Sequence, residues 1–271
     1  MHAATAAQTN IARPTAATAT VWMLCWREWT RFFRQRNRVI GALGQPILFW
    51  LLFGTGMHST FRGGDQNFMT YYLPGTIALI LLFTAIFATI SIIEDRREGF
   101  LQSVLVAPVS PMAIVLGKVL GGTALAFGQG LIFLLLAPLV GFGFTFISFL
   151  LAIVIMFVTA MGLTALGFCI AWRMSSTQGF HAIMNLFLMP MWFLSGALFP
   201  AEGAWVGRKY VIYANPLSYG LSGLRQAMDW YASGPAWGAY GLSLGISILF
   251  AGALMLLASA IARTRIQADF Q

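Results

Sequence analysis

Charged residues are scarce in this chain of 271 residues: Asp, Glu, Lys and Arg make up 9%, whereas 59% of the residues are hydrophobic. Soluble proteins carry roughly 25% charged residues, so a soluble fold of this size would lack the polar side chains that cover a surface. Together with a mean hydropathy of +0.78, the composition indicates a membrane protein. It excludes the disordered, collagen-like and disulfide-scaffold classes.

Cysteine patterns and nucleotide-binding motifs are also missing. Cys25 and Cys169 lie far apart in apolar or aromatic surroundings, which gives neither a metal-ligand spacing nor a disulfide framework. The only Gly-Lys pair, Gly117-Lys118, is followed by Val119, so it does not match the phosphate-binding loop of ATPases. We therefore expect no catalytic residues, no metal, no cofactor and no ATP site in this chain.

The chain has only three histidines, whereas a zinc protease needs two histidines and a carboxylate that converge. His58 is interpreted as a solvated loop residue. His181 lies four residues before Asn185, so the two share one helix face. This pair fits contact with a substrate or ordinary helix packing, and an intramembrane enzyme is kept as an alternative that the residues disfavour.

Six apolar stretches are each long enough to cross a hydrocarbon core of roughly 30 Å, which takes about 20 helical residues. They are residues 39–57, 72–93, 114–137, 146–172, 180–199 and 239–262. The third and fourth belong to one uncharged run, 119–172, which is far too long for one crossing and must fold back. Pro138, Gly141 and Gly143 supply the breakers for that turn. The sequence therefore predicts an all-α integral membrane protein with six transmembrane helices.

The predicted spans contain one formal charge, Lys118, about one turn from a span end, where its side chain can snorkel to the headgroups. Ion-coupled transporters need ionisable or coordinating groups near mid-membrane. A proton- or sodium-driven secondary transporter is therefore disfavoured, although ion sites built from backbone groups stay open. Two GxxxG spacings, 117–121 and 241–245, permit close helix approach, and we interpret both as packing within one chain.

The first twenty residues are mostly Ala and Thr and are predicted to form a disordered tail before a single transmembrane domain, residues 21–271. Residues 21–38 have a helical period, with aromatic side chains on one side and arginines on the other. The anchoring side chains are Trp22, Trp26, Trp29, Arg27, Arg31 and Arg34. Trp favours the headgroup level and Arg reaches phosphates, which predicts an interfacial amphipathic helix. A basic flank that only sets orientation is the alternative.

Lys and Arg residues near the spans predict the orientation, because they favour the cytoplasmic side. If the spans alternate, one side collects Arg27, Arg31, Arg34, Arg36, Arg38, Arg96, Arg97, Lys118, Arg173, Arg263 and Arg265, and the other Arg62, Arg208, Lys209 and Arg225. This asymmetry places both termini in the cytoplasm. Headgroups and topology explain the net charge of +8, so no nucleic-acid partner is expected.

A run of five charged residues, 94–98, ends the second predicted span. Gly99 follows, and an apolar helical face then begins at Phe100 and Leu101 and runs until Pro108. We predict a short amphipathic helix on the cytoplasmic surface that offers polar groups to a soluble partner. A solvated charge run that merely ends the span is the alternative, and the residues alone favour neither.

Residues 94–118, EDRREGFLQSVLVAPVSPMAIVLGK, resemble the stretch after the second span in membrane subunits of ABC type-2 (ABC-2) exporters. Residues 193–200, FLSGALFP, resemble the end of that family's fifth span, and residues 215–226, NPLSYGLSGLRQ, the segment before its sixth. The motifs occur in the family's order, and the resemblance covers nearly the whole chain after residue 20. Phe100 departs from it, since many members have Thr there, and this leaves the subfamily open.

The resemblance implies the ABC-2 exporter fold, in which a permease pairs with a second copy or a homologue around a central path through the lipid bilayer. Two separate ATP-binding-cassette subunits, which bind ATP and Mg, would dock below, and the loop helix would transmit their movement. The implied coupling residues are Glu94, Asp95, Arg96, Arg97, Glu98, Gly99, Phe100 and Leu101. Arg96 and Arg97 are expected to face acidic cassette groups or anionic headgroups. The implied location is the bacterial inner (plasma) membrane, in multi-pass form.

Residues 201–238 form the predicted fifth outer segment, rich in Gly, Trp and Tyr. Composition and resemblance both favour short re-entrant helices here, with Asn215 as an N-cap before Pro216 in the first turn, and with Tyr219 and Arg225 following. A plain extracellular loop is the alternative. A nearly uncharged path lined by Phe, Met and Leu fits a hydrophobic or amphipathic cargo, such as a drug, a lipid or a lipid-linked glycan.

Overall fold

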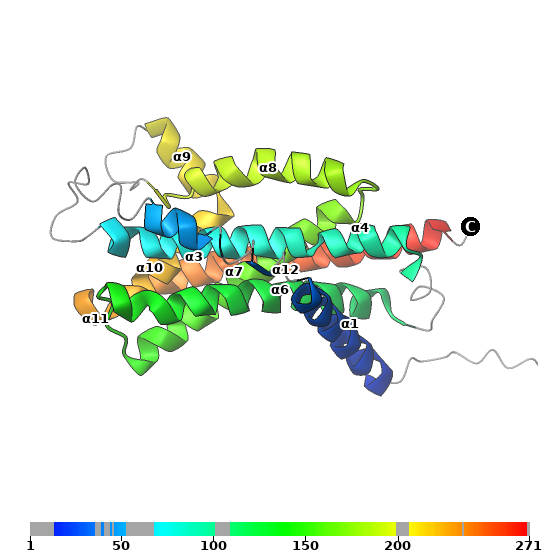
Figure 1. Cartoon of the computed structure of the whole chain (residues 1–271), viewed down its shortest axis with the longest axis horizontal. Coiled ribbons are helices and arrows are strands. Elements are labelled where there is room, and N and C mark those ends of the chain that lie inside the picture. The colour runs from blue at the N-terminus through cyan, green and yellow to red at the C-terminus, as the bar shows by residue number, and fades with distance from the viewer. Residues whose placement is uncertain are drawn as a thin grey trace, which may run out of the picture.

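The computed structural model describes residues 14–35, 39–40, 44, 46–52, 68–100, 109–198, 206–234 and 236–269, and the regular structure within these ranges is helical throughout. Its elements are α1 (Pro14–Arg34), α3 (Phe68–Ala88), α4 (Ile90–Arg97), α6 (Pro111–Leu136), the 3-10 turn η1 (Ala137–Val140), α7 (Phe146–Ala171), α8 (Thr177–Phe193), α9 (Val206–Ala214), α10 (Pro216–Met228), α11 (Trp230–Ser233) and α12 (Trp237–Asp269). Figure 1 shows the long helices side by side in one bundle. The all-α prediction is confirmed for the described residues.

Within the described residues, four helical stretches are long and apolar enough to cross a membrane: Thr70–Arg97, Pro111–Val140, Phe146–Ala171 and Trp237–Thr264. They coincide with the second, third, fourth and sixth predicted spans. The fifth predicted span corresponds to α8, which has 17 residues and ends at Phe193 rather than at residue 199. Of the first predicted span, residues 39–40, 44 and 46–52 are helical, and the remainder lies outside the described residues.

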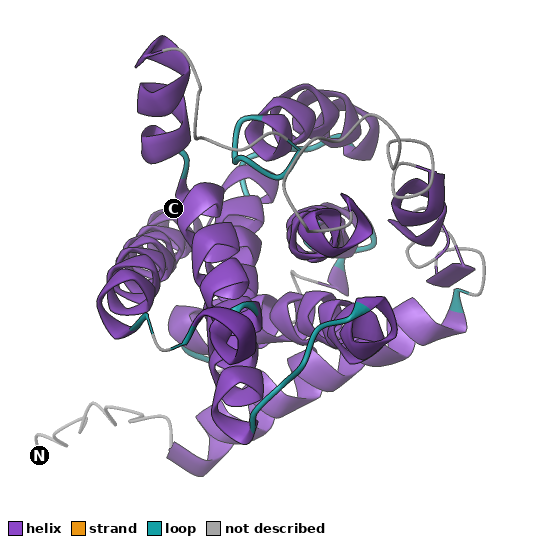
Figure 2. Ribbon diagram, turned by 90° about the vertical axis from the view of Figure 1, so that its left-hand side faces the viewer, coloured by secondary structure: helices purple, strands orange, loops and turns teal. Residues whose placement is uncertain are grey.

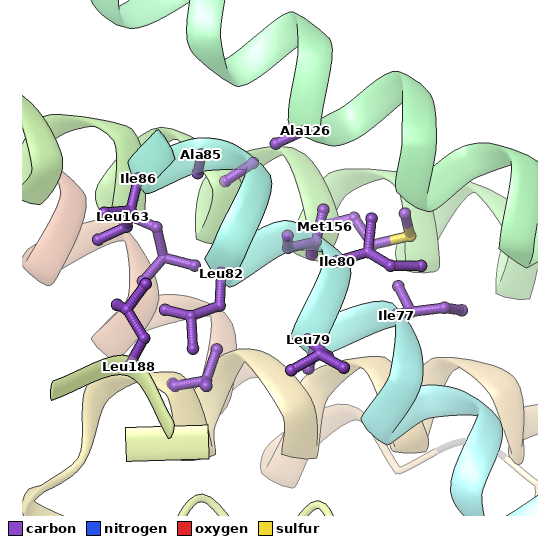
Figure 3. Close-up of a cluster of buried hydrophobic side chains, with 14 of the residues drawn as sticks. Ile77, Leu79, Ile80, Leu82, Ala85, Ile86, Ala126, Met156, Leu163 and Leu188 are labelled. Atoms are coloured by element: carbon purple, nitrogen blue, oxygen red, sulfur yellow. The ribbon is translucent and has the colours of Figure 1, made fainter. Parts of the chain in front are cut away.

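The core is built around α3. This helix is apolar on all sides, as a helix surrounded by other helices must be, and its side chains are almost entirely buried. Figure 3 shows its inner side chains between those of the neighbouring helices: Ile77, Leu79, Ile80, Leu82, Ala85 and Ile86 from α3, with Ala126 from α6, Met156 and Leu163 from α7, and Leu188 from α8. Because α3 continues into α4 after Thr89, the charged residues of α4 are attached directly to the central helix of the bundle.

The uncharged run folds back as a hairpin of α6 and α7. Pro138 lies in η1, and Gly141 ends that turn with a φ of 98°, in the left-handed region that favours glycine. Thr145 then caps α7, because its hydroxyl accepts a hydrogen bond from the Ser148 amide (3.1 Å) while the Ser148 hydroxyl accepts one from the Thr145 amide (2.9 Å). The chain therefore reverses at the breakers that the sequence predicted.

The two ends of the bundle differ. In Figure 1, α1, the end of α4 and the end of α12 lie toward one side, whereas α9, α10, α11 and the α6–α7 turn lie toward the other. Figure 2, which looks along the bundle, shows α1 lying across the long helices instead of running alongside them. The strongly basic predicted side and the predicted outer segment thus occupy opposite ends of the molecule.

α1 corrects the predicted boundaries of the first helix. It begins at Pro14, so residues 14–20 are helical although the tail was predicted to be disordered there, and it ends at Arg34 instead of residue 38. Residues 1–13 lie outside the described part of the chain. Trp22 and Trp26 are 67% and 61% exposed, and their rings stack with centroids 6.4 Å apart. This aromatic face lies on the outside of the protein, where an interfacial helix needs it.

Candidate functional site

Asp95, on the last turn of α4, is the centre of a charge cluster that joins α1, α4 and α6. Its carboxylate is completely buried. Arg27 donates to it from both terminal nitrogens, Nη1 to Oδ2 and Nη2 to Oδ1, each at 2.7 Å, and Arg31 Nη1 donates to Oδ1 at 3.0 Å. A two-bond pair between Arg and a carboxylate fixes direction as well as distance. The crossing helix α1 is therefore held to the end of the central helix in one orientation.

Lys118 on α6 is the third cation of the cluster. Its side chain is only 3% exposed, and Nζ donates to Asp95 and to Glu28 of α1, which is also buried. The prediction that Lys118 snorkels to the headgroups is wrong. The reason is that two carboxylates from other helices reach it inside the protein, so it has no need to extend toward water.

The cluster balances charge in a place that water reaches poorly. Desolvation of a buried charge is costly, so removal of one partner leaves a strong penalty on the others. Burial works against the charged form of Arg27, but its hydrogen bonds to Asp95 and the nearby acidic charges outweigh this and raise its pKa. The Arg27 guanidinium therefore stays charged and keeps its ion pair with Asp95, which holds α1 against α4.

Glycines on α6 let α1 approach closely enough to form this cluster. A Cβ at Gly117 would lie 2.7 Å from Leu24 Cβ, and one at Gly121 would lie 2.9 Å from Glu28 Cγ. The interpretation of the 117–121 spacing as packing within the chain is therefore supported. For 241–245 that interpretation is wrong, because a Cβ at either glycine would meet nothing within 4 Å among the described residues.

Three more of the predicted coupling residues, Glu94, Glu98 and Phe100, form the rim of the cluster. Arg31 Nη2 lies 2.7 Å from Glu94 Oε2 and 3.6 Å from Glu98 Oε1, and Glu98 is 61% exposed. The Arg27 guanidinium lies over the Phe100 ring, 3.7 Å from its centroid. Between these residues, Gly99 adopts a φ of 76°, which turns the chain away from α4. Leu101 and the rest of the predicted amphipathic helix lie outside the described residues.

Arg96 points away from the cluster, although it directly follows Asp95. Its Nη2 donates to the Trp172 carbonyl at 2.7 Å and its Nη1 to the Met174 carbonyl at 3.1 Å, at the end of α7. The expectation that Arg96 faces a cassette or the headgroups is therefore wrong in this structure, because the negative end of the α7 dipole attracts the cation. Arg97 is exposed, as the prediction requires, and so is Arg34 at the end of α1.

The described part of the outer segment, from Val206 onward, is largely helical and has the predicted cap. The Asn215 side chain accepts a hydrogen bond from the Leu217 amide (3.0 Å), and Pro216 occupies the first turn of α10. The amide of Asn215 also donates to the Met191 carbonyl of α8 (2.6 Å). α10 is thereby fixed to the end of α8, which a plain loop would not do.

Two other predicted residues of this segment have backbone partners. Tyr219 donates from its hydroxyl to the Tyr213 carbonyl at 2.9 Å. Arg225 Nη2 donates to the carbonyls of Gly196 (3.0 Å) and Ala197 (3.3 Å), just beyond α8, and its guanidinium lies over the Tyr71 ring. Both side chains therefore support the packing of the outer helices.

His181, the histidine considered as a possible substrate contact, does not lie in a catalytic arrangement in the described structure. The His181 ring packs at a tilt against Phe87 of α3, with ring centroids 5.0 Å apart and an angle of 38° between the planes, and His181 is otherwise exposed, as is Asn185. In the part of the chain that the structure describes, no three His, Cys, Asp or Glu residues converge to hold a metal.

Glu28 is the functional residue that sequence reasoning missed. It is the only acidic residue of α1, and it lies at four-residue steps from Leu24 and Phe32, which are both buried. A lone carboxylate on the apolar stripe of an amphipathic helix predicts a buried cationic partner. That signal was present and would have indicated Lys118, the one cation within the spans.

Comparisons with known proteins find that the sequence of this chain is similar to those of transport proteins. Residues 19–229 match the model of a family described as ABC-2 type transporter. The transport permease ycf38 of Cyanophora paradoxa is 24% identical over 210 residues, 76% of this chain and 72% of the relative. Nodulation protein J of Sinorhizobium fredii is 26% identical over 213 residues (76% and 80%). Daunorubicin resistance ABC transporter permease protein DrrB1 of Streptomyces coeruleorubidus is 23% identical over 228 residues (80% and 77%).

Proposed function

The chain belongs to the ABC-2 type transporter family, and on that premise we propose that it exports a hydrophobic or amphipathic compound. As a family member it is a multi-pass membrane permease, the transport subunit of an ABC exporter, and it has no ATPase domain of its own. ATP binding resides in a partner subunit. Membership sets aside the intramembrane enzyme and the ion-coupled carrier.

The exposed face of α8 is the observation that supports this cargo. Four side chains at four-residue steps, Phe180, Met184, Leu188 and Trp192, bury one stripe of α8. The remaining face is open and mixes large apolar side chains, such as Phe187, with the polar His181 and Asn185. Polar side chains are costly against lipid, so a helix that carries them outward is expected to face protein or a solvated path.

Aromatic rings continue this face onto α3. The rings of Phe83 and Phe87 are 5.7 Å apart, and Phe87 is in ring contact with His181. A surface of aromatic rings beside an imidazole and an amide offers stacking and hydrogen bonds together, which suits an amphipathic molecule better than a purely polar one. The name of the relative DrrB1, which refers to daunorubicin resistance, supports a drug-like cargo among the alternatives.

A second permease copy or a homologue would complete the path against the open face of α8. The pairing accounts for polar groups that a lone chain would leave in lipid. We place the pair in the bacterial inner membrane, with both chain termini in the cytoplasm, because α1 and α4, which lie toward one end of the bundle in Figure 1, carry Arg31, Arg34, Arg96 and Arg97 in their last turns. Six spans per chain remain part of the proposal.

The ATP-binding subunit would dock at the charged end of α4. Glu98 and Arg97 are exposed there, whereas Asp95 is locked inside. The exposed charges can meet a soluble partner, and the buried cluster can carry the resulting force into α1 and α6. A coupling element needs both functions, contact with the ATP-binding subunit and a firm connection to the membrane helices, and this short segment would provide both.

Transport by the complex of this chain and its ATP-binding subunit, reconstituted in inside-out vesicles, tests the cargo. We expect ATP-dependent uptake of an amphipathic fluorescent dye, and lower uptake after His181→Leu with Asn185→Leu. Leu249→Ala, at an exposed site on α12, is the matched control and should leave uptake unchanged. Uptake of a lipid-free oligosaccharide in preference to the dye, or equal uptake by the double variant, would contradict the proposal.

A further inference from the structure

We propose that Arg96 is a positioning residue that links the coupling segment to α8, so that movement of the α4 end tilts α8 about its outer end. The inference rests on the proposed function, since it concerns how ATP-driven movement would reach the transport path. In this role Arg96 connects two helices of the same chain and binds neither the ATP-binding subunit nor a lipid headgroup.

The end of α4 is held on two sides by consecutive residues. Asp95 is bound by Arg27 and Lys118 on one side, which ties α4 to α1 and α6. Arg96 reaches in a different direction, to the carbonyls of Trp172 and Met174. A displacement of this turn of α4 is therefore passed on to the segment that joins α7 to α8.

The contact made by Arg96 has the geometry of a clamp. Two nitrogens of one rigid guanidinium bind two carbonyls that are separated by one residue, and the guanidinium also lies 5.5 Å from the centroid of the Trp172 ring. Carbonyls at the end of a helix lack helical partners and carry the negative end of the helix dipole. Lys has one nitrogen on a flexible stem, so it lacks the rigid two-nitrogen fork that fixes Arg96 on both carbonyls.

Only a short connection separates the carbonyls that Arg96 binds from the start of α8. Ser176 lies two residues after Met174 and caps α8, because its hydroxyl accepts a hydrogen bond from the Gly179 amide at 3.2 Å. No long loop absorbs a displacement between the Arg96 contact and the first turn of the helix. The inner end of α8 therefore follows the end of α4.

α8 is also the long helix that is best able to move. Among the described helices it packs mainly against α3, with a smaller contact to α4, through the face that carries its four buried side chains, while the opposite face is exposed. α3, α6 and α7, by contrast, pack against several helices each. Figure 1 shows α8 at the edge of the bundle, apart from the central helices.

The outer end of α8 is fixed independently of Arg96. Trp192 donates from Nε1 to the Gly75 carbonyl of α3 at 2.9 Å, and Arg225 binds the carbonyls of Gly196 and Ala197. A Cβ at Gly75 would lie 2.8 Å from the Ala197 carbonyl oxygen, so the backbones are in close contact there. With the outer end fixed and the inner end attached to α4, movement of α4 produces a tilt of α8.

The test compares Arg96→Gln, Arg96→Lys and the control Arg263→Gln, which removes an exposed arginine on α12 that lies outside the proposed docking surface. Each variant carries Leu186→Cys on the exposed face of α8 in a background without Cys25 and Cys169, and is assembled with the ATP-binding subunit. Two quantities are measured: the rate of thiol labelling at residue 186 with and without trapped ATP, and the amount of dye transported per ATP hydrolysed.

We expect the parent and Arg263→Gln to change labelling rate when ATP is trapped. Arg96→Gln should lose this change and transport about tenfold less dye per ATP, a loss in line with removal of a charge-assisted two-bond contact. Arg96→Lys should give values of both quantities between those of the parent and Arg96→Gln. If Arg96→Gln does not fold, Arg96→Lys alone is compared with the parent. Parent-like labelling and coupling in both Arg96 variants would overturn the inference, as would loss of subunit binding, which would place Arg96 at the docking surface. Absence of ATP-driven transport in the parent would instead overturn the proposed function.

Discussion

Asp95 of α4 and Lys118 of α6 form a buried ion pair between a predicted surface loop and a predicted membrane span. Around this pair, Arg27, Arg31 and Glu28 bring in the crossing helix α1. The three helices thus meet in one ionic joint at the end of the bundle. Separation of α1, α4 and α6 would leave buried charges unpaired, so these ion pairs hold the three helices together.

Loss of the central carboxylate should be far more damaging than loss of a carboxylate at the rim. We expect Asp95→Asn to lower the free energy of unfolding by about 3–5 kcal/mol, as is usual when one partner of a buried ion pair is removed. Glu98→Gln, at a largely exposed site, should cost about 0–1 kcal/mol. Denaturant unfolding of the purified chain in detergent measures both, and equal effects would contradict the structure.

Close packing of α1 on α6 can be tested with two glycine substitutions. Gly117→Ala places a Cβ 2.7 Å from Leu24 Cβ, so α1 must shift, and a loss of about 1–3 kcal/mol is expected from overpacking. Gly241→Ala meets no atom within 4 Å and should be neutral or stabilising by up to about 1 kcal/mol, since Ala is the better helix former. Thermal unfolding distinguishes the two, and equal destabilisation would argue against the packing of α1 on α6.

Charge reversal at the rim should separate insertion from transport. Glu94→Lys combined with Glu98→Lys puts two cations beside Arg31, which now lies 2.7 Å from Glu94 Oε2. We expect normal abundance and membrane insertion, because lipid burial of the spans is unchanged, but loss of transport with altered cassette association or ATP hydrolysis. Normal transport at parental abundance would mean that these charges only end a span.

Orientation can be tested by thiol labelling in intact cells. Single cysteines introduced at Ser103 and Gln267 should resist a membrane-impermeant reagent, whereas one at Gly64 should react. Both natural cysteines are removed for this test, although burial raises the pKa of the Cys25 thiol and slows its reaction. Labelling of residue 103 from outside would reverse the proposed orientation.

Much of the fold was predictable from the sequence because membrane burial leaves a strong local signal. Length and hydropathy located the long spans, and the breakers Pro138 and Gly141 located the hairpin turn. The cap at Asn215 was predictable for a similar reason, since capping depends on neighbours along the chain. The end of α8 was harder to place, because the apolar sequence continues beyond Phe193 where the helix stops.

The interior of the candidate site depended on contacts distant in sequence. A charge run predicts exposure, yet Asp95 is buried because α1 folds across it and supplies Arg27. Arg96 and Arg97 look equivalent in the sequence, but their positions around α4 point one to the end of α7 and the other to solvent. Only the packing of helices separates them.

Dependence of transport on the partner subunit tests the central claim most directly. Proteoliposomes that contain the chain alone, or the chain with its ATP-binding subunit, are given ATP or an imposed proton or sodium gradient, and dye uptake is measured. We expect uptake only with the partner and ATP together, because this chain is the transport subunit and ATP binding resides in the partner. Gradient-driven uptake by the chain alone would contradict it.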